Sequence, residues 1–249
     1  MNTTVLSIGY DDECLKSEAE ELAHRLHLPI DNQCLPRLSV TTDKLVLLVQ
    51  GYAPLYADFH SKNIVRRREA GKDQGIIRAC RPQAGLRIVD ATAGWGRDAA
   101  LLASFGAAVL MIERQPVVAA LLADALSRMR ESNLKLSLIC ADAGSYLQSL
   151  SVDDRPDVIY IDPMHPVRQK SALVKKDMQV LQQLIGADDD AAILLQQALR
   201  TARQRVVIKW PQRLPPLLSP NHSIQGKTVR FDVYCCSDNV QKIPLSSVN

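Results

Sequence analysis

The chain has 249 residues, of which 47% are hydrophobic and 23% are charged, and its formal net charge at pH 7 is +3. This composition can fill the core of one large α/β domain, or of a small domain beside a medium one, and it excludes disorder as the main state. No apolar run reaches the roughly 18 residues that span a bilayer, and the first residues carry neither a basic leader nor a small-residue cleavage site, so we expect a soluble, cytoplasmic protein with no membrane partner.

The basic residues of the chain fall into clusters. Residues 60–81 hold seven basic and two acidic side chains, and further basic groups lie within 168–176 and 200–213. Such clusters favour a polyanion as partner, although an ordinary solvated face explains charge alone equally well. The six cysteines include no CxxC pair and no Cys/His cluster with zinc-ligand spacing, so we expect reduced, mostly structural thiols and no metal site.

Residues 1–75 predict a small α+β extension that precedes the main domain. The residue pattern indicates a strand near 5–8, a helix over 14–26 and a strand within 43–50. These elements are short, and no nucleotide-binding glycine turn lies among them. The basic segment 61–80 then leads into the larger part of the chain.

Residues 76–240 predict an α/β domain, because strand and helix patterns alternate from residue 85 onward. The alternation indicates a mostly parallel sheet with helices on both faces, and residues 241–249 are left as a tail. The expected strands lie at 86–91, 108–113, 135–142, 157–162, 205–210 and 226–236, and the expected helices lie at 99–106, from 116 onward, at 171–186 and at 188–204.

A glycine turn, "TAGWGRD", follows the first strand of this domain and leads into a helix. Strand, glycine turn and helix form the arrangement in which backbone N–H groups face a ligand, and Gly94 and Gly96 keep side chains out of the way. The third glycine of a dinucleotide fingerprint is absent, since Ala99 takes its place. The turn therefore favours a nucleoside ligand without phosphates over a pyrophosphate cofactor.

Carboxylates end four successive strands, at Asp90, Glu113, Asp142 and Asp162. Glu113 follows Gly94 by 19 residues, close to the spacing at which an acid accepts hydrogen bonds from ribose hydroxyls. Asp142 stands where a side chain can receive the amine of an adenine. A single acid in such a place is usually a helix cap or a solvated turn, but four in a row beside a glycine turn predict a ligand site at this rim of the sheet.

S-adenosylmethionine (SAM) contains a nucleoside without phosphates, which is the kind of ligand that this site favours. Its sulfonium supplies an activated methyl group. An aromatic amine is a poor nucleophile, and a hydrogen-bond acceptor for its N–H restores some reactivity and fixes its orientation. Asp162, with the carbonyl of Pro163, is our candidate acceptor. His165 is assigned to stacking on the base or to shaping the site rather than to general-base catalysis, so the predicted catalytic group is Asp162, Pro163 and His165.

The segments "DATAGWGRDA", "VLMIERQPVVAALL", "YIDPMHPVRQKSALVKKDM", "RVVIKWP" and "RFDVY" recur in order across about residues 87–234. In these segments the chain resembles the RsmJ family of bacterial small-subunit ribosomal RNA methyltransferases. The resemblance implies a class I, Rossmann-like methyltransferase fold and SAM-dependent methylation of the exocyclic 2-amino group of one guanosine of 16S rRNA, numbered 1516 in the family, with S-adenosyl-L-homocysteine as product. The turn and the strand ends give the predicted cofactor-binding residues Asp90, Gly94, Gly96, Glu113, Asp142 and Asp162. The resemblance implies four more, which are Arg97, Asp98, Arg114 and Ala143.

The chain departs from the expected family pattern at three positions. Trp95 stands where we expect leucine, His165 where we expect phenylalanine, and Trp210 where we expect arginine. The first is assigned to packing, the second puts a weaker stacking group beside the base, and the third removes one positive charge from the presumed RNA face.

The predicted partner is 16S rRNA, within the 30S subunit or a late precursor, and no protein partner is predicted. We assign phosphate contacts to Arg66, Arg67, Lys170 and Lys209, and the 1–75 extension offers a further RNA contact. Two other readings stay open: methylation of another nucleic-acid amine such as that of adenine, and a non-catalytic RNA-binding or assembly protein that keeps the cofactor fold. A nicotinamide dehydrogenase ranks last, since it needs the missing third glycine.

Overall fold

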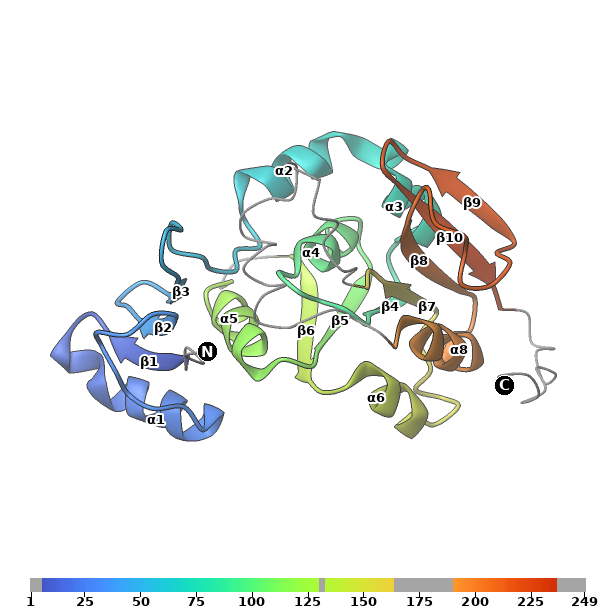
Figure 1. Cartoon of the computed structure of the whole chain (residues 1–249). Helices are drawn as coiled ribbons and strands as arrows, with labels where there is room; N and C mark the ends of the chain where they lie inside the picture. The colour runs from blue at the N-terminus through green and yellow to red at the C-terminus, as the bar shows by residue number, and fades with distance from the viewer. Residues whose placement is uncertain (1–5, 130–132, 164–189, 237–249) are drawn as a thin grey trace.

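The computed structural model describes residues 6–129, 133–163 and 190–236, and two β-sheets lie within these residues (Figure 1). The helix expected at 171–186 and the tail at 241–249 lie outside the described residues. The helices and strands are β1 (Ser7–Tyr10), α1 (Lys16–Leu26), β2 (Arg37–Val40), β3 (Leu45–Leu48), α2 (Lys62–Glu69), α3 (Gly75–Cys80), β4 (Arg87–Asp90), α4 (Arg97–Ala103), β5 (Ala108–Glu113), α5 (Pro116–Ser127), β6 (Lys135–Cys140), α6 (Ala143–Ser149), β7 (Val158–Ile161), α8 (Ala191–Thr201), β8 (Arg205–Pro211), β9 (His222–Gln225) and β10 (Val229–Cys235), with 3-10 turns at Glu13–Leu15 and Gly71–Asp73.

The smaller sheet belongs to the N-terminal part of the chain. Strands β1 and β2 pair in parallel and β2 and β3 pair antiparallel, while α1 packs on this sheet through Ala19, Leu22 and Ala23. Strand β1 spans Ser7–Tyr10 and pairs with β2 from Ser7 opposite Arg37 onward, and residue 5, where the expected strand starts, lies outside the described residues. Strand β2 was not predicted, since four residues after a proline give too short a pattern.

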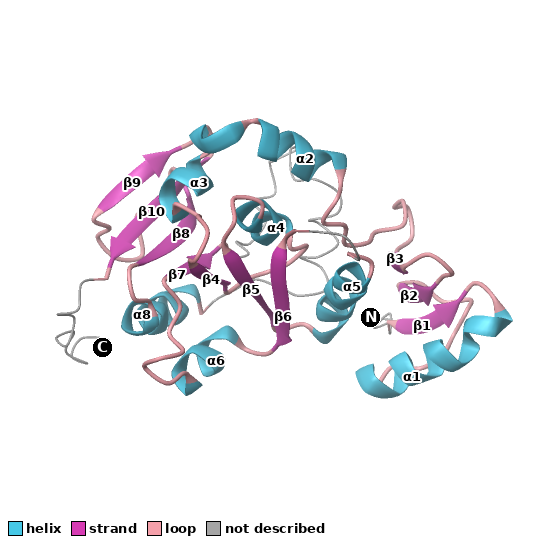
Figure 2. Ribbon diagram, turned by 180° about the vertical axis from the view of Figure 1, so that it is seen from behind, coloured by secondary structure: helices cyan, strands magenta, loops and turns pink. Residues whose placement is uncertain are grey.

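The larger sheet has seven strands in the order β6-β5-β4-β7-β8-β10-β9. The first five are parallel, and β10 and β9 are antiparallel to their neighbours. Figure 2, seen from behind, shows α4 and α5 on one side of this sheet and α6 and α8 on the other. The predicted Rossmann-like architecture, a mostly parallel sheet with helices on both faces, is therefore confirmed.

Strand β7 shows how the sheet divides the core into two layers. Val158 and Tyr160 point into the cluster that holds α4 and α5, and Ile159 and Ile161 point into the cluster beneath α6 and α8. All four side chains are fully buried. A central parallel strand covered on both faces needs a continuous apolar run, which explains why "VIYI" precedes the acid at residue 162.

The basic segment that follows the extension is helical. Helix α2 packs against α4 through the buried Ile64, and α3 packs against β8 and β10 through Ile76 and Ile77. At the start of α3, a Cβ on Gly75 would lie 2.6 Å from the Phe231 ring, so glycine allows this close approach. These contacts place α2 next to the helix that follows the glycine turn. The domain boundary at residue 75 stays a prediction.

A buried ion pair lies within β10, between two residues on the same strand. The Arg230 Nε donates to Asp232 Oδ1 at 2.8 Å, and both side chains are buried. The Arg230 Nη1 also donates to the carbonyl oxygens of Pro211, Gln212 and Leu214. This arginine therefore fixes the turn that follows β8.

Candidate functional site

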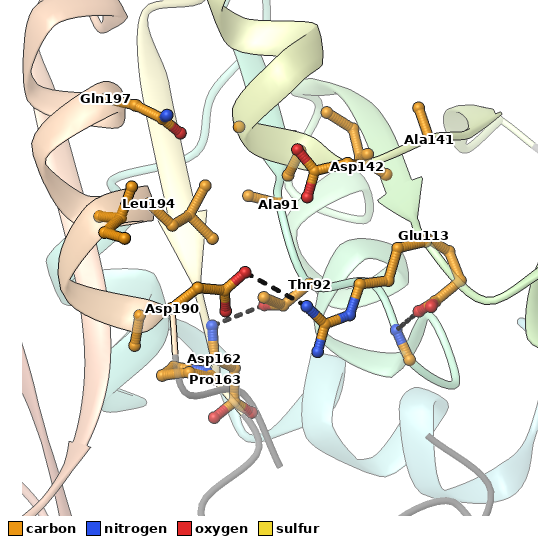
Figure 3. Close-up of a pocket in the computed structure, with 17 residues that line it drawn as sticks. Ala91, Thr92, Glu113, Ala141, Asp142, Asp162, Pro163, Asp190, Leu194 and Gln197 are labelled. Carbon is orange, nitrogen blue, oxygen red and sulfur yellow. Dashed lines mark hydrogen bonds and ion pairs between the residues drawn. The ribbon is translucent and has the colours of Figure 1, made fainter. Parts of the chain in front are cut away.

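A cavity of about 270 Å³ opens at the carboxyl ends of β4, β5, β6 and β7 (Figure 3). In the sheet order, β4 has β5 on one side and β7 on the other, so the strand order reverses next to β4. Open α/β sheets bind their ligands at such a reversal. The cavity is lined by the ends of these strands and by α8, which contributes Ile193, Leu194 and Gln197.

The two glycines of the turn have different roles. Both have positive φ, +51° at Gly94 and +68° at Gly96. A Cβ on Gly96 would lie 2.6 Å from Phe59 Cε1 and 2.9 Å from Leu122 Cδ2, whereas the nearest atom to a Cβ on Gly94 is the Thr92 carbonyl at 4.0 Å. Gly94 lines the cavity and Gly96 does not. Gly96 therefore allows close packing against Phe59 and α5, and Gly94 keeps the cavity open.

Glu113 holds the glycine turn in place. Its buried carboxylate accepts from the Gly94 N–H at 3.0 Å through Oε2 and from the Gln115 N–H at 2.8 Å through Oε1. The next residue, Arg114, forms an ion pair at 3.3 Å with Asp190, and both residues line the cavity; Asp190 is labelled in Figure 3. Both Glu113 and Arg114 line the cavity, and Glu113 is the residue for which the sequence predicts a ribose contact.

Asp142 begins α6 at the cavity wall. Its Oδ1 accepts from both the backbone N–H and the Oγ of Ser145, each at 2.8 Å, and these hydrogen bonds hold the pKa of the carboxyl below its usual range. Ala143 and Gly144 follow it along the wall. Asp142 is thus a helix cap, the alternative that the sequence left open, and it also lines the cavity.

Asp162 follows β7 directly, and hydrogen bonds hold both its backbone and its carboxylate. Its backbone N–H donates to Thr92 Oγ1 at 2.7 Å, and its Oδ2 accepts from Lys209 Nζ at 2.5 Å. The side chain is 32% exposed, and Pro163 lines the cavity beside it. The proposed acceptor is therefore fixed at the edge of the cavity by partners from two neighbouring strands.

Two further predicted residues, Asp90 and Asp98, lie outside the cavity lining. Asp90 is 1% exposed and accepts from the Thr92 N–H at 3.2 Å; burial and then the neighbouring Asp98 raise its pKa well above the ordinary range. Asp98 accepts from Arg67 at 2.8 Å and from the Tyr160 hydroxyl at 2.7 Å. Burial raises the pKa of Asp98, but Lys209 and Arg67 outweigh it and the net shift is downward.

The remaining predicted residues are spread over the described surface or lie outside it. Arg97 lines a separate cavity of about 230 Å³ with Trp95. Arg66 is exposed on α2, and Arg67 bonds to Asp98. His165 and Lys170 lie outside the described residues.

Sequence reasoning missed several residues that shape this site. Thr92, Asp190 and the apolar part of α8 line the cavity, and Lys209 bonds to Asp162 although we had assigned it to phosphate. A usable signal was Thr92 in "DATAG", a hydroxyl two residues beyond the end of β4. The contact between Lys209 and Asp162 could not be read from spacing, because 47 residues separate them.

Within the described ranges, no group of three or more His, Cys, Asp or Glu side chains is placed to hold a metal ion. None of the helices in that part of the chain is long and apolar enough to cross a membrane.

Comparison with known proteins adds three findings. The family model described as "Putative SAM-dependent methyltransferase" matches residues 21–236. Proteins named ribosomal RNA small subunit methyltransferase J are similar to this chain: that of Legionella pneumophila is 55% identical and covers 92% of this chain and 96% of its own, and that of Coxiella burnetii is 46% identical and covers 94% and 98%. A crystal structure of a SAM-dependent methyltransferase from Neisseria gonorrhoeae is similar with a TM-score of 0.71 and 28% identity, over 93% of this chain and 96% of that one.

Proposed function

Because this chain belongs to the ribosomal RNA small subunit methyltransferase J family of SAM-dependent methyltransferases, we propose that it methylates the exocyclic 2-amino group of a guanosine in 16S rRNA. The guanosine is the one numbered 1516 in the family. The observation that carries the proposal is the position of Asp162, a carboxylate at the edge of a cavity whose other walls suit a nucleoside.

The residues of the cavity fit SAM. Gly94 leaves open space where a side chain would stand, and Glu113 places a carboxylate at the end of β5, where ribose hydroxyls are bound in related sheets. The cavity wall formed by Ala143, Leu194 and Ile193 offers an apolar surface for a base. When bound, SAM supplies a methyl group activated by its sulfonium.

Asp162 would position the substrate amine. The lone pair of a guanine 2-amino group is delocalised into the ring, so an acceptor for its N–H both orients the nitrogen and raises its electron density. Two hydrogen bonds support this role, because Thr92 fixes the backbone of Asp162 and Lys209 fixes its carboxylate. The proton that the amine loses after methylation goes to solvent, so no separate base is needed.

The RNA would approach across α2. Its side chains Lys62, Arg66 and Arg68 are exposed, and the helix lies against α4, which begins at the glycine turn. Phosphate contacts from such a helix give binding that weakens as salt rises. We place the reaction in the cytoplasm, on the 30S subunit or a late precursor.

The test is nucleoside mass spectrometry of 16S rRNA from cells that lack this gene. We expect the loss of one N2-methylguanosine, restored by the wild-type gene and by the control Asp153→Ala, which changes an exposed carboxylate, but not by Asp162→Ala. Loss of a methylated adenine instead would assign another base, and an unchanged nucleoside profile would support a non-catalytic role.

A further inference from the structure

Lys209 lies beside Asp162 because their strands are neighbours. In the pairing of β7 and β8, Ile161 stands opposite Ile208, so the next residues on the two strands are Asp162 and Lys209. The Lys209 ammonium is 2.5 Å from Asp162 Oδ2 and 3.7 Å from Asp98 Oδ2. Its side chain is 29% exposed, so most of it is covered by the protein.

Lys209 belongs to a row of alternating charges. Arg67 on α2 bonds to Asp98 at 2.8 Å, Asp98 lies 3.7 Å from Lys209, and Lys209 bonds to Asp162. The Tyr160 hydroxyl donates to Asp98 Oδ2 at 2.7 Å and helps to fix that carboxylate. Burial alone would lower the pKa of Lys209, but Asp162 and Asp98 outweigh it and raise the pKa above the usual range. The ammonium therefore stays charged at neutral pH.

We propose that Lys209 is a positioning residue that keeps Asp162 ionised and oriented for the substrate amine, and is not a phosphate contact. The proposal rests on the proposed function and deepens it. A carboxylate has about four acceptor sites, so its bond to Lys209 leaves capacity for an amine N–H. A phosphate, in contrast, would have to draw the ammonium away from two carboxylates that already balance its charge.

Removal of the ammonium would change how the site titrates. Asp162 and Asp98 would then lose the cation that contacts both of them, with Asp90 buried nearby on β4, and neighbouring like charges disfavour ionisation. Arg67 would remain on the far side of Asp98, and Tyr160 would remain its hydrogen-bond donor. Loss of Lys209 therefore raises the pKa of Asp98, which the ammonium lowers in the wild type, and we expect turnover to rise with pH as the carboxyls of this cluster lose their protons.

The experiment compares Lys209→Met, Lys209→Gln and Lys209→Arg with the wild type, and uses Lys227→Met as a control because Lys227 is exposed between β9 and β10. The kcat for methyl transfer is measured with saturating SAM and saturating 30S particles from pH 6 to 9, and the affinity for RNA is measured at several salt concentrations. We expect Lys209→Met and Lys209→Gln to lower kcat at pH 7 by about 10- to 100-fold, with partial recovery toward pH 9. The arginine variant, which keeps the charge, should stay closer to the wild type than either neutral variant.

The same data separate the two roles of Lys209. A positioning role leaves RNA affinity within about threefold of wild type and the salt slope unchanged, whereas loss of a phosphate contact lowers the slope by about 0.7 to 0.9. Wild-type kcat and pH profile in both neutral variants, with weaker and less salt-dependent RNA binding, would overturn the proposal. The wild-type protein tests the proposed function independently of Lys209. If the wild type transfers no methyl group, the proposed function itself fails.

Discussion

The two glycines of the turn provide a matched pair of substitutions, because the same methyl group meets a different environment at each. Gly96→Ala brings a Cβ to 2.6 Å from Phe59 Cε1 and forces φ of +68° on an alanine. Left-handed backbone costs an L-residue about 1–2 kcal/mol and overpacking about 1–3 kcal/mol, so the expected loss of stability is about 2–5 kcal/mol. In Gly94→Ala only the backbone cost applies, since no atom lies closer than 4.0 Å to the new Cβ.

These energies translate into different readouts. At about 2–4 °C per kcal/mol for a chain of this size, we expect Tm to fall by about 4–20 °C in Gly96→Ala and by about 2–8 °C in Gly94→Ala. SAM affinity, measured by calorimetry well below Tm, should fall at least about tenfold in Gly94→Ala, because its methyl group occupies space that the ligand needs, and should change little in Gly96→Ala. Equal loss of Tm in the two variants, or wild-type SAM binding by Gly94→Ala, would refute the assignment of the turn.

Three more predictions concern charge. Asp90→Asn should gain stability relative to wild type as pH rises from about 4 toward neutral. The Asp90 carboxyl has a raised pKa and binds its proton more tightly in the folded state, so the wild-type fold loses stability as that proton leaves. Unfolding at a series of pH values measures the difference. Asp232→Ala should cost about 3–5 kcal/mol in denaturant unfolding, because it leaves the buried Arg230 without its ion partner. Arg66→Ala should weaken RNA binding and lower its salt slope by about 0.7 to 0.9, without loss of SAM affinity.

Each of these has a control or a contrary outcome. Asp153→Asn removes an exposed carboxylate and should show no such pH-dependent gain, and a constant difference between Asp90→Asn and wild type at all pH values would contradict the linkage argument. A loss below about 1 kcal/mol in Asp232→Ala would mean that Arg230 finds another partner. Lys227→Ala, between β9 and β10, is the exposed control for Arg66, and an equal loss of RNA affinity in both would point to non-specific charge.

The fold could be predicted where the sequence pattern is long and unambiguous. Strand β5 has the predicted bounds, and α5 begins at Pro116 as expected, because an apolar strand and a proline at the first helical position leave few alternatives. Strands β2 and β9 and helices α2, α3 and α6 were missed. They are four to eight residues long, and β2 and β9 depend on pairing with strands that the local pattern does not reveal.

The sequence predicts that carboxylates gather at one rim of the sheet, but it does not predict which of their side chains face the cavity. Glu113, Asp142 and Asp162 line the cavity, whereas Asp90 is buried beside it, because the side chains of successive strand residues point to opposite faces and the pattern does not say which acid faces outward. Charge clustering marked Lys209 as a candidate for polyanion binding. Only the register of β7 and β8 shows that it meets an acid.

The most direct test of the central claim is methyl transfer in a purified system. The protein is incubated with SAM carrying a labelled methyl group and with 30S particles from cells that lack the gene, and the labelled nucleoside is identified by mass spectrometry. The account predicts label on the 2-amino group of one guanosine, with turnover greatly reduced in Asp162→Ala while SAM affinity falls less. Absence of label, or full turnover by Asp162→Ala, would contradict it.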